Sequence, residues 1–150
     1  MKLTVSKLNK FLLFKLPSAF FFGVRVKEID VNKCVVSVKH RWINQNPFNS
    51  MYFAVQAMAA ELSTGALVMF QIAKSGRKIS MLVANNKGNF TKKATGRITF
   101  TCNDGHLIEK AILETIATGE GQTFWMKSIG TNETGIQVSE MDFEWSVRVK

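Results

Sequence analysis

Residues 51–73 read Met-Tyr-Phe-Ala-Val-Gln-Ala-Met-Ala-Ala-Glu-Leu-Ser-Thr-Gly-Ala-Leu-Val-Met-Phe-Gln-Ile-Ala, the longest apolar run of the chain. Alanine, methionine and leucine dominate it, and these residues favour helix. Pro47 and Asn49-Ser50 stand before the run, and Lys74-Ser-Gly76 follows it, as is typical of the two ends of a helix. The sequence therefore predicts one long helix, and because it is apolar on every side it should be buried on every side.

Glu61 is the only charged residue in this run. A carboxylate surrounded by apolar groups has its pKa raised, which suits a general acid or base near neutral pH. Small residues such as Ala57 and Gly65 share its helical face, so another backbone or a thin ligand can approach, and Thr64 can donate a hydrogen bond one turn on. The alternative is a purely structural buried acid, bonded to Thr64 and the backbone.

The rest of the composition narrows the choice of chemistry. A chain of 150 residues predicts a single domain, 1–150, with a core of its own. Cys34 and Cys102 lie in alternating apolar runs and predict core positions, and the two histidines lie far apart, so we expect no metal site. Motifs for serine nucleophiles, dinucleotides or nucleoside triphosphates do not occur.

Basic residues gather in one part of the chain. The net charge is +9, and the span between Leu62 and Asn103 holds seven lysines and arginines and no acid. Such a span forms either a solvated face or a surface that attracts a phosphorylated ligand or nucleic acid. Phe90 is the only aromatic residue between Phe70 and Phe100, so no base-stacking platform is evident and we expect no nucleic-acid partner.

Two stretches have compositions similar to those of membrane segments. Residues 11–23 resemble a signal peptide, but Lys15 and Pro17 interrupt them. Residues 51–73 are long enough to span a bilayer, yet Glu61 would then cost roughly 2.5–3.5 kcal/mol near its centre. Because the remaining chain alternates like a soluble sheet, we expect no membrane span and a cytoplasmic location.

The periodicity on either side of the long helix predicts an α+β fold, in which one antiparallel sheet of about five to six strands wraps the helix. Around the helix we expect the following elements: a helix over 3–15 that Pro17 ends, an apolar connector 18–23, a hairpin 24–31 and 33–42, strands 79–86, 89–94 and 97–103 with a turn at Lys87-Gly88, a short helix capped by Asp104 and ended by Gly119, and a terminal hairpin 122–130 and 135–150 with a bulge near Ser139-Glu140. In the first hairpin, Cys34, Val36, Val38, His40 and Trp42 fall on one face. A partner subunit would bury what the sheet leaves uncovered.

The first turn of the long helix is a candidate binding site. Backbone N–H groups around Ser50 to Phe53 lack helical acceptors and could hold a developing oxyanion. Asn46 or Asn49 could orient a ligand there.

This region resembles the hotdog-fold thioesterases, most closely the PaaI-like group and the hotdog domains known as DUF4442. That family opens its central helix with Asn-Pro-x-Gly-x-x-His-Gly-Gly and places an acid nine residues after the histidine. Residues 46–54 read Asn-Pro-Phe-Asn-Ser-Met-Tyr-Phe-Ala, and Glu61 follows at that position. Asn49 replaces the first glycine, and Tyr52-Phe53-Ala54 replaces His-Gly-Gly. Residues 89–94 resemble the family's strand beside the ligand, and the order of elements fits over essentially the whole chain.

The resemblance implies a homodimer, possibly a tetramer, that hydrolyses an acyl-CoA or another acyl thioester between two subunits. Glu61 would be the general base or nucleophile, the Phe53 backbone amide would hold the oxyanion, and Asn46 would belong to the same catalytic group. No cofactor is implied, because coenzyme A is part of the substrate. Substrate contacts are implied for a larger set, in which the last three would meet the CoA phosphates: Ser50, Tyr52, Thr64, Asn89, Phe90, Lys92, Lys93 and Arg97.

A second interpretation stays open, because the His-Gly-Gly triplet is replaced. The chain could be a non-catalytic hotdog module that binds acyl groups or acyl-CoA. A hydratase relative fits less well, since those enzymes carry an Asp/His pair. The acyl chain length, the pathway and the assembly beyond a dimer are not encoded in these residues.

Overall fold

A computed structural model describes residues 3–150, so Met1 and Lys2 of the predicted domain 1–150 lie outside the described residues. The elements are α1 (Val5–Lys15), α2 (Pro17–Phe21), β1 (Arg25–Ile29), β2 (Cys34–Lys39), the 3-10 turn η1 (Trp42–Asn44), α3 (Phe53–Ser75), β3 (Ile79–Phe90), β4 (Arg97–Cys102), α4 (Gly105–Thr118), β5 (Gln122–Thr131) and β6 (Gln137–Val149).

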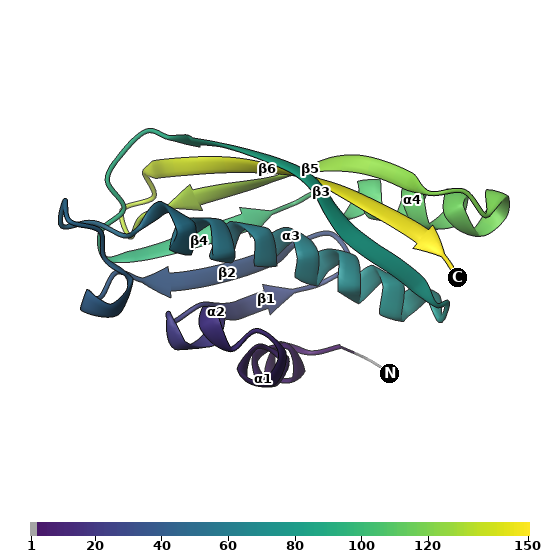
Figure 1. Cartoon of the computed structure of the whole chain (residues 1–150), viewed down its shortest axis with the longest axis horizontal. Helices are drawn as coiled ribbons and strands as arrows, with labels where there is room; N and C mark the ends of the chain where they lie inside the picture. The colour runs from purple at the N-terminus through teal and green to yellow at the C-terminus, as the bar shows by residue number, and fades with distance from the viewer. Residues whose placement is uncertain (1–2) are drawn as a thin grey trace.

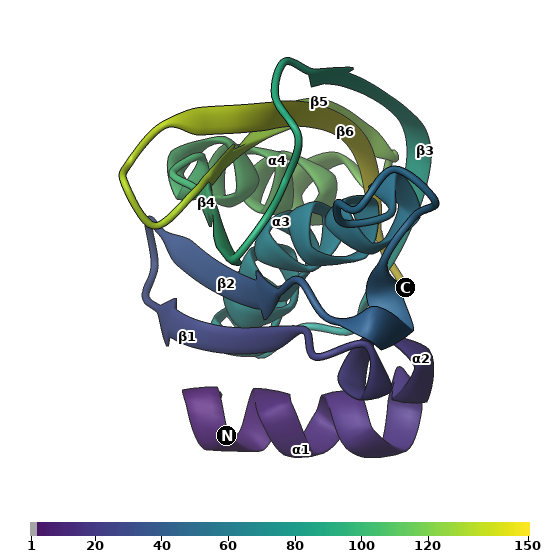
Figure 2. The same cartoon turned by 90° about the vertical axis from the view of Figure 1, so that its left-hand side faces the viewer.

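One antiparallel sheet of six strands, in the order β1-β2-β4-β5-β6-β3, curls around α3 (Figures 1 and 2). The view along α3 in Figure 2 shows strands on several sides of the helix, with α4 beside it and α1 beyond β1. The predicted α+β architecture, a long helix wrapped by one antiparallel sheet, is confirmed.

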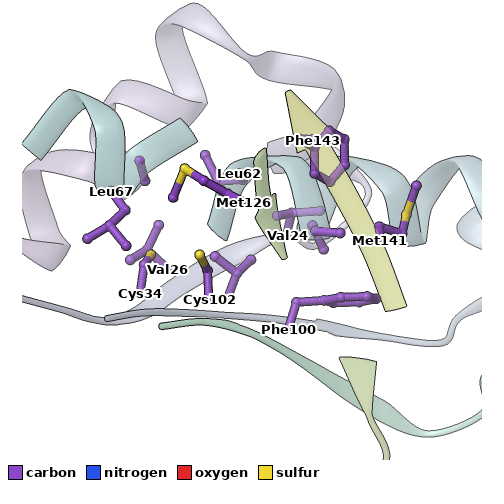
Figure 3. Close-up of a cluster of buried hydrophobic side chains, with 14 of the residues drawn as sticks. Val24, Val26, Cys34, Leu62, Leu67, Phe100, Cys102, Met126, Met141 and Phe143 are labelled. Carbon is purple, nitrogen blue, oxygen red and sulfur yellow. The ribbon is translucent and has the colours of Figure 1, made fainter. Parts of the chain in front are cut away.

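The core forms where α3 meets the concave face of the sheet (Figure 3). Leu67 and Val68 of α3 are fully buried, and so are Phe100 of β4 and Met126 of β5. Full burial of each such side chain contributes about 1.5–3 kcal/mol, so the helix stabilises the sheet and the sheet stabilises the helix. By length and hydropathy alone α3 passes as a membrane span, but 61% of its most apolar window is buried inside this domain.

Cys34 and Cys102 confirm the prediction of core positions. They are 68 residues apart in the sequence, yet they lie directly opposite each other on β2 and β4 and close together in Figure 3. Both are free thiols, and burial raises the pKa of each to about 12. Both therefore stay protonated and unreactive at neutral pH.

The edge strand β1 is covered by α1. The Asn9 side chain accepts a hydrogen bond from the Val26 N–H at 2.9 Å and donates one to the Val26 carbonyl at 2.9 Å. One amide thus replaces the missing neighbouring strand, which protects an edge that could otherwise pair with another chain.

The predicted turn at Lys87-Gly88 is wrong, because β3 runs without a break from Ile79 to Phe90. Its partner β6 is one residue longer and pairs across the supposed turn, with Gly88 opposite Met141. A Cβ at Gly88 would lie 3.2 Å from the Met141 side chain, so this glycine permits close packing instead of marking a turn.

Two predictions near the N-terminus need correction. Pro17 ends α1 but also begins α2, as suits proline in a first helical turn, so the expected connector contains a helix. The second arm of the first hairpin ends at Lys39, and Trp42 is 83% exposed instead of facing inward. The reason is Asn44, whose amide donates to the carbonyls of Lys39 and Phe22 and turns the chain away from the sheet.

Two predictions in the C-terminal half shift slightly. Asp104 stands at the start of α4, but its carboxylate accepts from the Lys127 backbone N–H at 2.8 Å and does not cap the helix. The irregularity in the terminal hairpin lies at Val138, because Gly130 pairs with Ser139 and Thr131 with Gln137. The predicted bulge is therefore confirmed one residue earlier than expected.

We expect Asn9→Ala to lower the free energy of unfolding by about 1–2 kcal/mol, because the edge of β1 loses two hydrogen bonds while alanine slightly favours α1. Lys10→Ala, at an exposed neighbouring position, is the matched control. Urea denaturation of both variants measures the difference, and equal stabilities would contradict the role of Asn9.

Candidate functional site

The loop before α3 is held by Asn46. Its side chain donates to the Ser50 hydroxyl at 2.9 Å and to the Met51 carbonyl at 3.3 Å, and it accepts from the Phe48 N–H at 2.9 Å. Asn49 adopts a left-handed backbone with φ of 59°, which asparagine tolerates better than most residues. The loop therefore keeps a backbone shape suited to glycine although no glycine is present.

The first turn of α3 offers two free backbone donors. Tyr52 stands at the N-cap and its side chain makes no capping hydrogen bond. Within residues 3–150, neither the Phe53 nor the Ala54 N–H has a hydrogen-bond acceptor. Open N–H groups and the helix dipole together make this turn a place for a negatively charged or developing oxyanion.

A cavity of about 470 Å³ opens beside this turn, and we call it the helix-entry pocket. Its volume lies within the usual range for small-molecule sites. Its lining comes from the loop before α3, the first turns of α3 and the segment after β3: Asn46, Pro47, Phe48, Ser50, Met51, Tyr52, Phe53, Gln56, Phe90, Thr91, Lys92, Lys93 and Ala94. The predicted site residues Asn46, Ser50, Tyr52, Phe53, Phe90, Lys92 and Lys93 are thus brought together.

Aromatic rings line one side of the helix-entry pocket. The Phe53 ring meets the Phe90 ring edge to face, with 6.0 Å between centroids, and the Tyr52 ring with 5.1 Å. Phe53 is still 56% exposed and Tyr52 48% exposed. An apolar group can therefore lie on these rings, directly beside the open N–H groups.

Gln56 is a pocket residue that the sequence analysis missed. Gln56 is only 4% exposed, and its buried Oε1 atom has no hydrogen-bond partner in the part of the chain that the structure describes. An unpaired buried carbonyl oxygen costs free energy until it finds a donor, so Gln56 gives the pocket an acceptor for a ligand to meet. The sequence did carry one indication of this role, because Gln56 is a polar residue near the start of a mostly apolar helix.

Glu61 lies farther along α3 and is partly buried. Its carboxylate makes no ion pair or hydrogen bond among the described residues, and burial raises the pKa of the carboxyl group above its usual value. Gly65 makes room for it, since a Cβ there would lie 3.2 Å from Glu61 Oε1 and 3.0 Å from the Trp145 ring. The predicted raised pKa of an acid among apolar groups is therefore present.

Thr64 does not bond the Glu61 carboxylate. Its hydroxyl donates to the Glu61 backbone carbonyl at 2.8 Å and accepts from the Trp145 indole N–H at 2.9 Å. Thr64 is fully buried and lies outside the helix-entry pocket. Its place in the structure is to fix Trp145, which in turn packs beside Gly65 and Glu61.

Within one chain, Glu61 and the open N–H groups do not meet. Glu61 comes eight residues after Phe53, which is about 12 Å along the helix axis. The helix-entry pocket does not include Glu61.

Two other predicted residues lie outside the helix-entry pocket. Asn89 is an exposed residue of β3 opposite Glu140, and Arg97 lines a different, cationic pocket. Lys93 reaches the helix-entry pocket and donates to the Phe48 carbonyl at 3.0 Å. Across residues 3–150, no three or more His, Cys, Asp or Glu side chains are grouped as metal ligands.

Comparisons with known proteins give a family and a fold. A family model described as "domain of unknown function (DUF4442)" matches residues 6–147. A protein of unknown function from Pseudomonas aeruginosa, described as a probable thioesterase, is 22% identical with a TM-score of 0.84, over 100% of this chain and 99% of its own. A protein of unknown function from Chlorobaculum tepidum is 13% identical, with a TM-score of 0.85 and 99% of both chains covered.

A thioesterase from Haemophilus influenzae is 12% identical with a TM-score of 0.76, over 99% of this chain and 93% of its own. No curated protein matches the chain. At these identities the likeness to solved structures concerns the fold, which is the hotdog fold.

We expect Glu61→Gln to be more stable than the wild type at pH 7. A raised pKa means that ionisation of Glu61 is less favourable in the folded state than in the unfolded state. The free energy of unfolding therefore keeps the full contribution of protonated Glu61 below the unfolded carboxyl pKa of about 4.3, and this contribution is lost as pH rises through the higher folded pKa. Glutamine does not ionise, so the variant does not lose this contribution.

Denaturation midpoints from pH 3 to pH 8 measure this difference, which should grow with pH. Glu109→Gln, at an exposed position of α4, is the control. A Glu61→Gln difference that does not change with pH would contradict the burial of an ionisable carboxylate.

Proposed function

This chain belongs to the DUF4442 family, and on that premise we propose that it is a thioesterase that hydrolyses an acyl-CoA thioester with Glu61 as general base or nucleophile. The observation that carries the proposal is the state of Glu61, a partly buried carboxylate that has no partner among residues 3–150 and whose pKa is raised by burial. Burial makes protonation of this carboxylate more favourable, and a general base must accept a proton during the reaction. The open Phe53 N–H supplies the second requirement, a donor for an oxyanion.

A second copy of the chain would bring the two groups together. Ala54, Ala57, Met58 and Glu61 form a half-exposed stripe on one face of α3, and β3 is an edge strand bonded only to β6. Two copies that continue the sheet edge to edge at β3 would lay their α3 helices side by side in opposite directions. Glu61 of one copy then faces the Phe53 amide of the other. Two copies are needed because Glu61 and Phe53 of the same chain are about 12 Å apart along the helix and cannot both reach one thioester.

In the proposed reaction Glu61 removes a proton from water while the water oxygen bonds to the thioester carbonyl carbon. The carbonyl oxygen becomes an oxyanion that the Phe53 N–H stabilises. When the carbon–sulfur bond breaks, the thiolate takes the proton back from Glu61, so the products are a carboxylic acid and free CoA. Direct attack by Glu61 would instead give a mixed anhydride, which water then hydrolyses.

The helix-entry pocket would hold the part of the substrate next to the thioester. The Phe53 and Phe90 rings offer apolar contact, Gln56 offers an amide, and Lys92 and Lys93 at the rim attract phosphate. Coenzyme A enters as part of the substrate, and no separate cofactor is proposed. A cytoplasmic location, where acyl-CoA occurs and the free Cys34 and Cys102 thiols would persist, belongs to the same proposal.

One observation favours a second candidate, a non-catalytic module that binds acyl-CoA. The Phe53 side chain stands at the first turn of α3 and contacts Phe90, where the family has glycine. A bulky ring there can cover the N–H groups that an oxyanion must reach. Binding would then continue without hydrolysis.

We expect the wild type to release thiol from at least one acyl-CoA, and Glu61→Gln to lower kcat/KM about 100-fold or more, as for loss of a general base. A panel of chain lengths with a thiol-detecting reagent measures this, with Glu109→Gln as control. No turnover with any chain length, or turnover unchanged in Glu61→Gln, would exclude the thioesterase function, and a monomer at micromolar concentration in sedimentation would contradict the shared site.

We expect the combined substitution Tyr52→His, Phe53→Gly and Ala54→Gly to separate the two candidates. If Phe53 covers the donors, the triple variant gains turnover relative to the wild type, and adding Glu61→Gln removes the gain. If the wild type is already a catalyst, turnover is measurable before the substitution, and the triple variant only alters the value of kcat/KM. Circular dichroism checks the fold, because two added glycines weaken the first turn of α3 by about 1 kcal/mol each.

A further inference from the structure

A second pocket, away from the thioester chemistry, is lined almost entirely by cations. It has a volume of about 300 Å³ and lies on the outer face of the sheet where β1, β2 and β4 meet. We call it the cationic pocket, and its lining residues are Gly23, Arg25, Lys27, Lys39, Arg41 and Arg97. Five positive charges converge there, and no acidic residue lines it.

The sheet register forces two of these charges together. Lys39 and Arg97 are directly opposite each other on β2 and β4. Like charges at opposed positions of neighbouring strands destabilise a sheet. In residues 3–150 none of the five cations takes part in an ion pair, since the ion pairs found join Lys33 to Glu28 and Lys127 to Glu140 and Asp142.

Arg25 is held in a fixed position. Its guanidinium donates to the Phe20 carbonyl at 2.7 Å and to the Val24 carbonyl at 2.8 Å, and it lies 3.6 Å from the centre of the Phe20 ring. Burial, and then the nearby charge of Arg41, lower the pKa of Arg25. The protein thus orders this cation beside another cation, an arrangement that an anion would relieve.

Arg41 closes the pocket over a glycine. A Cβ at Gly23 would lie 2.7 Å from Arg41 Nη2, and the Gly23 backbone has φ of 94°. Arg41 also donates to the Phe21 carbonyl at 3.3 Å. Glu133 accepts from the Arg97 backbone N–H at 2.9 Å, whereas the Arg97 guanidinium donates to the Ser37 hydroxyl at 3.4 Å and forms no ion pair among residues 3–150.

Two exposed aromatic residues are close in the sequence to residues of the cationic pocket. Phe21 is 63% exposed and precedes Gly23 by two residues, and Trp42 is 83% exposed and follows Arg41 directly. Substitution of Trp42 therefore tests whether an exposed ring near the pocket contributes to ligand binding.

We propose that the cationic pocket is a binding site for the phosphate or pyrophosphate group of an organic phosphate ester. Guanidinium groups bind phosphate oxygens in pairs, and Lys27 and Lys39 add point charges. Two kinds of molecule carry this chemistry, a nucleotide, including the nucleotide end of CoA, and an anionic phospholipid. Ala94 of the helix-entry pocket and Arg97 of the cationic pocket are three residues apart in the sequence.

Sodium pyrophosphate is the first probe, measured by isothermal titration and by thermal shift against sodium chloride at equal ionic strength. The wild type should bind it and be stabilised beyond the chloride control. Lys39→Gln with Arg41→Gln should weaken binding about tenfold or more, as for loss of two charge-assisted contacts. Lys74→Gln with Arg77→Gln, at the C-terminal end of α3, removes the same charge and should leave binding unchanged.

The second set of probes identifies the source of the phosphate. CoA tests the nucleotide, and vesicles of phosphatidylcholine with phosphatidylglycerol test the lipid, each with the same two double variants and with Trp42→Ala. Loss of CoA affinity in Lys39→Gln/Arg41→Gln assigns the nucleotide, loss of vesicle binding assigns the lipid, and binding of pyrophosphate alone leaves a small soluble phosphate as the ligand.

Only the CoA measurement rests on the proposed function. The pyrophosphate measurement does not, so the failure of one idea is distinguishable from that of the other. A pyrophosphate effect that chloride reproduces, or that both double variants lose equally, would overturn the phosphate site. Because Lys39 and Arg41 are exposed and Lys39 faces a like charge, the double variant should remain folded, and its thermal midpoint without ligand checks this.

Discussion

The burial of α3 inside a curled sheet is the constraint on which the rest of this structure depends. A helix as apolar as residues 53–75 requires cover on nearly all sides, and six strands together with α4 supply it. The cover is incomplete along the face that carries Ala54, Ala57, Met58 and Glu61, which are half-exposed. The single carboxylate of the helix lies on this incompletely covered face.

Small residues and one indole define what surrounds that carboxylate. Gly65 leaves room for Glu61 beside Trp145, and Thr64 holds Trp145 by a hydrogen bond. Burial raises the pKa of Glu61, and no cation or donor among the described residues offsets that cost. Natural proteins commonly accept a loss of stability where it serves activity, and this is the physical reason for proposing Glu61 as the reactive group.

The two pockets differ in their chemistry. The helix-entry pocket combines aromatic rings, open N–H groups and a buried amide, whereas the cationic pocket is built on arginine and lysine. The net charge of +9 is therefore not spread evenly over the surface. Part of it is concentrated by strand register, which sets Lys39 against Arg97.

By itself the sequence determined the long helix, the strands with clear alternation and the isolation of Glu61, because apolar periodicity is a local property. It misplaced the turn at Lys87-Gly88, since Gly88 serves the packing of Met141 from β6, which no local pattern records. Only the tertiary structure decided that Gln56 enters a pocket, that Thr64 faces Trp145 and that Arg97 joins four other cations. Those facts depend on which strands become neighbours, and pairing across long sequence separations is set by the whole fold.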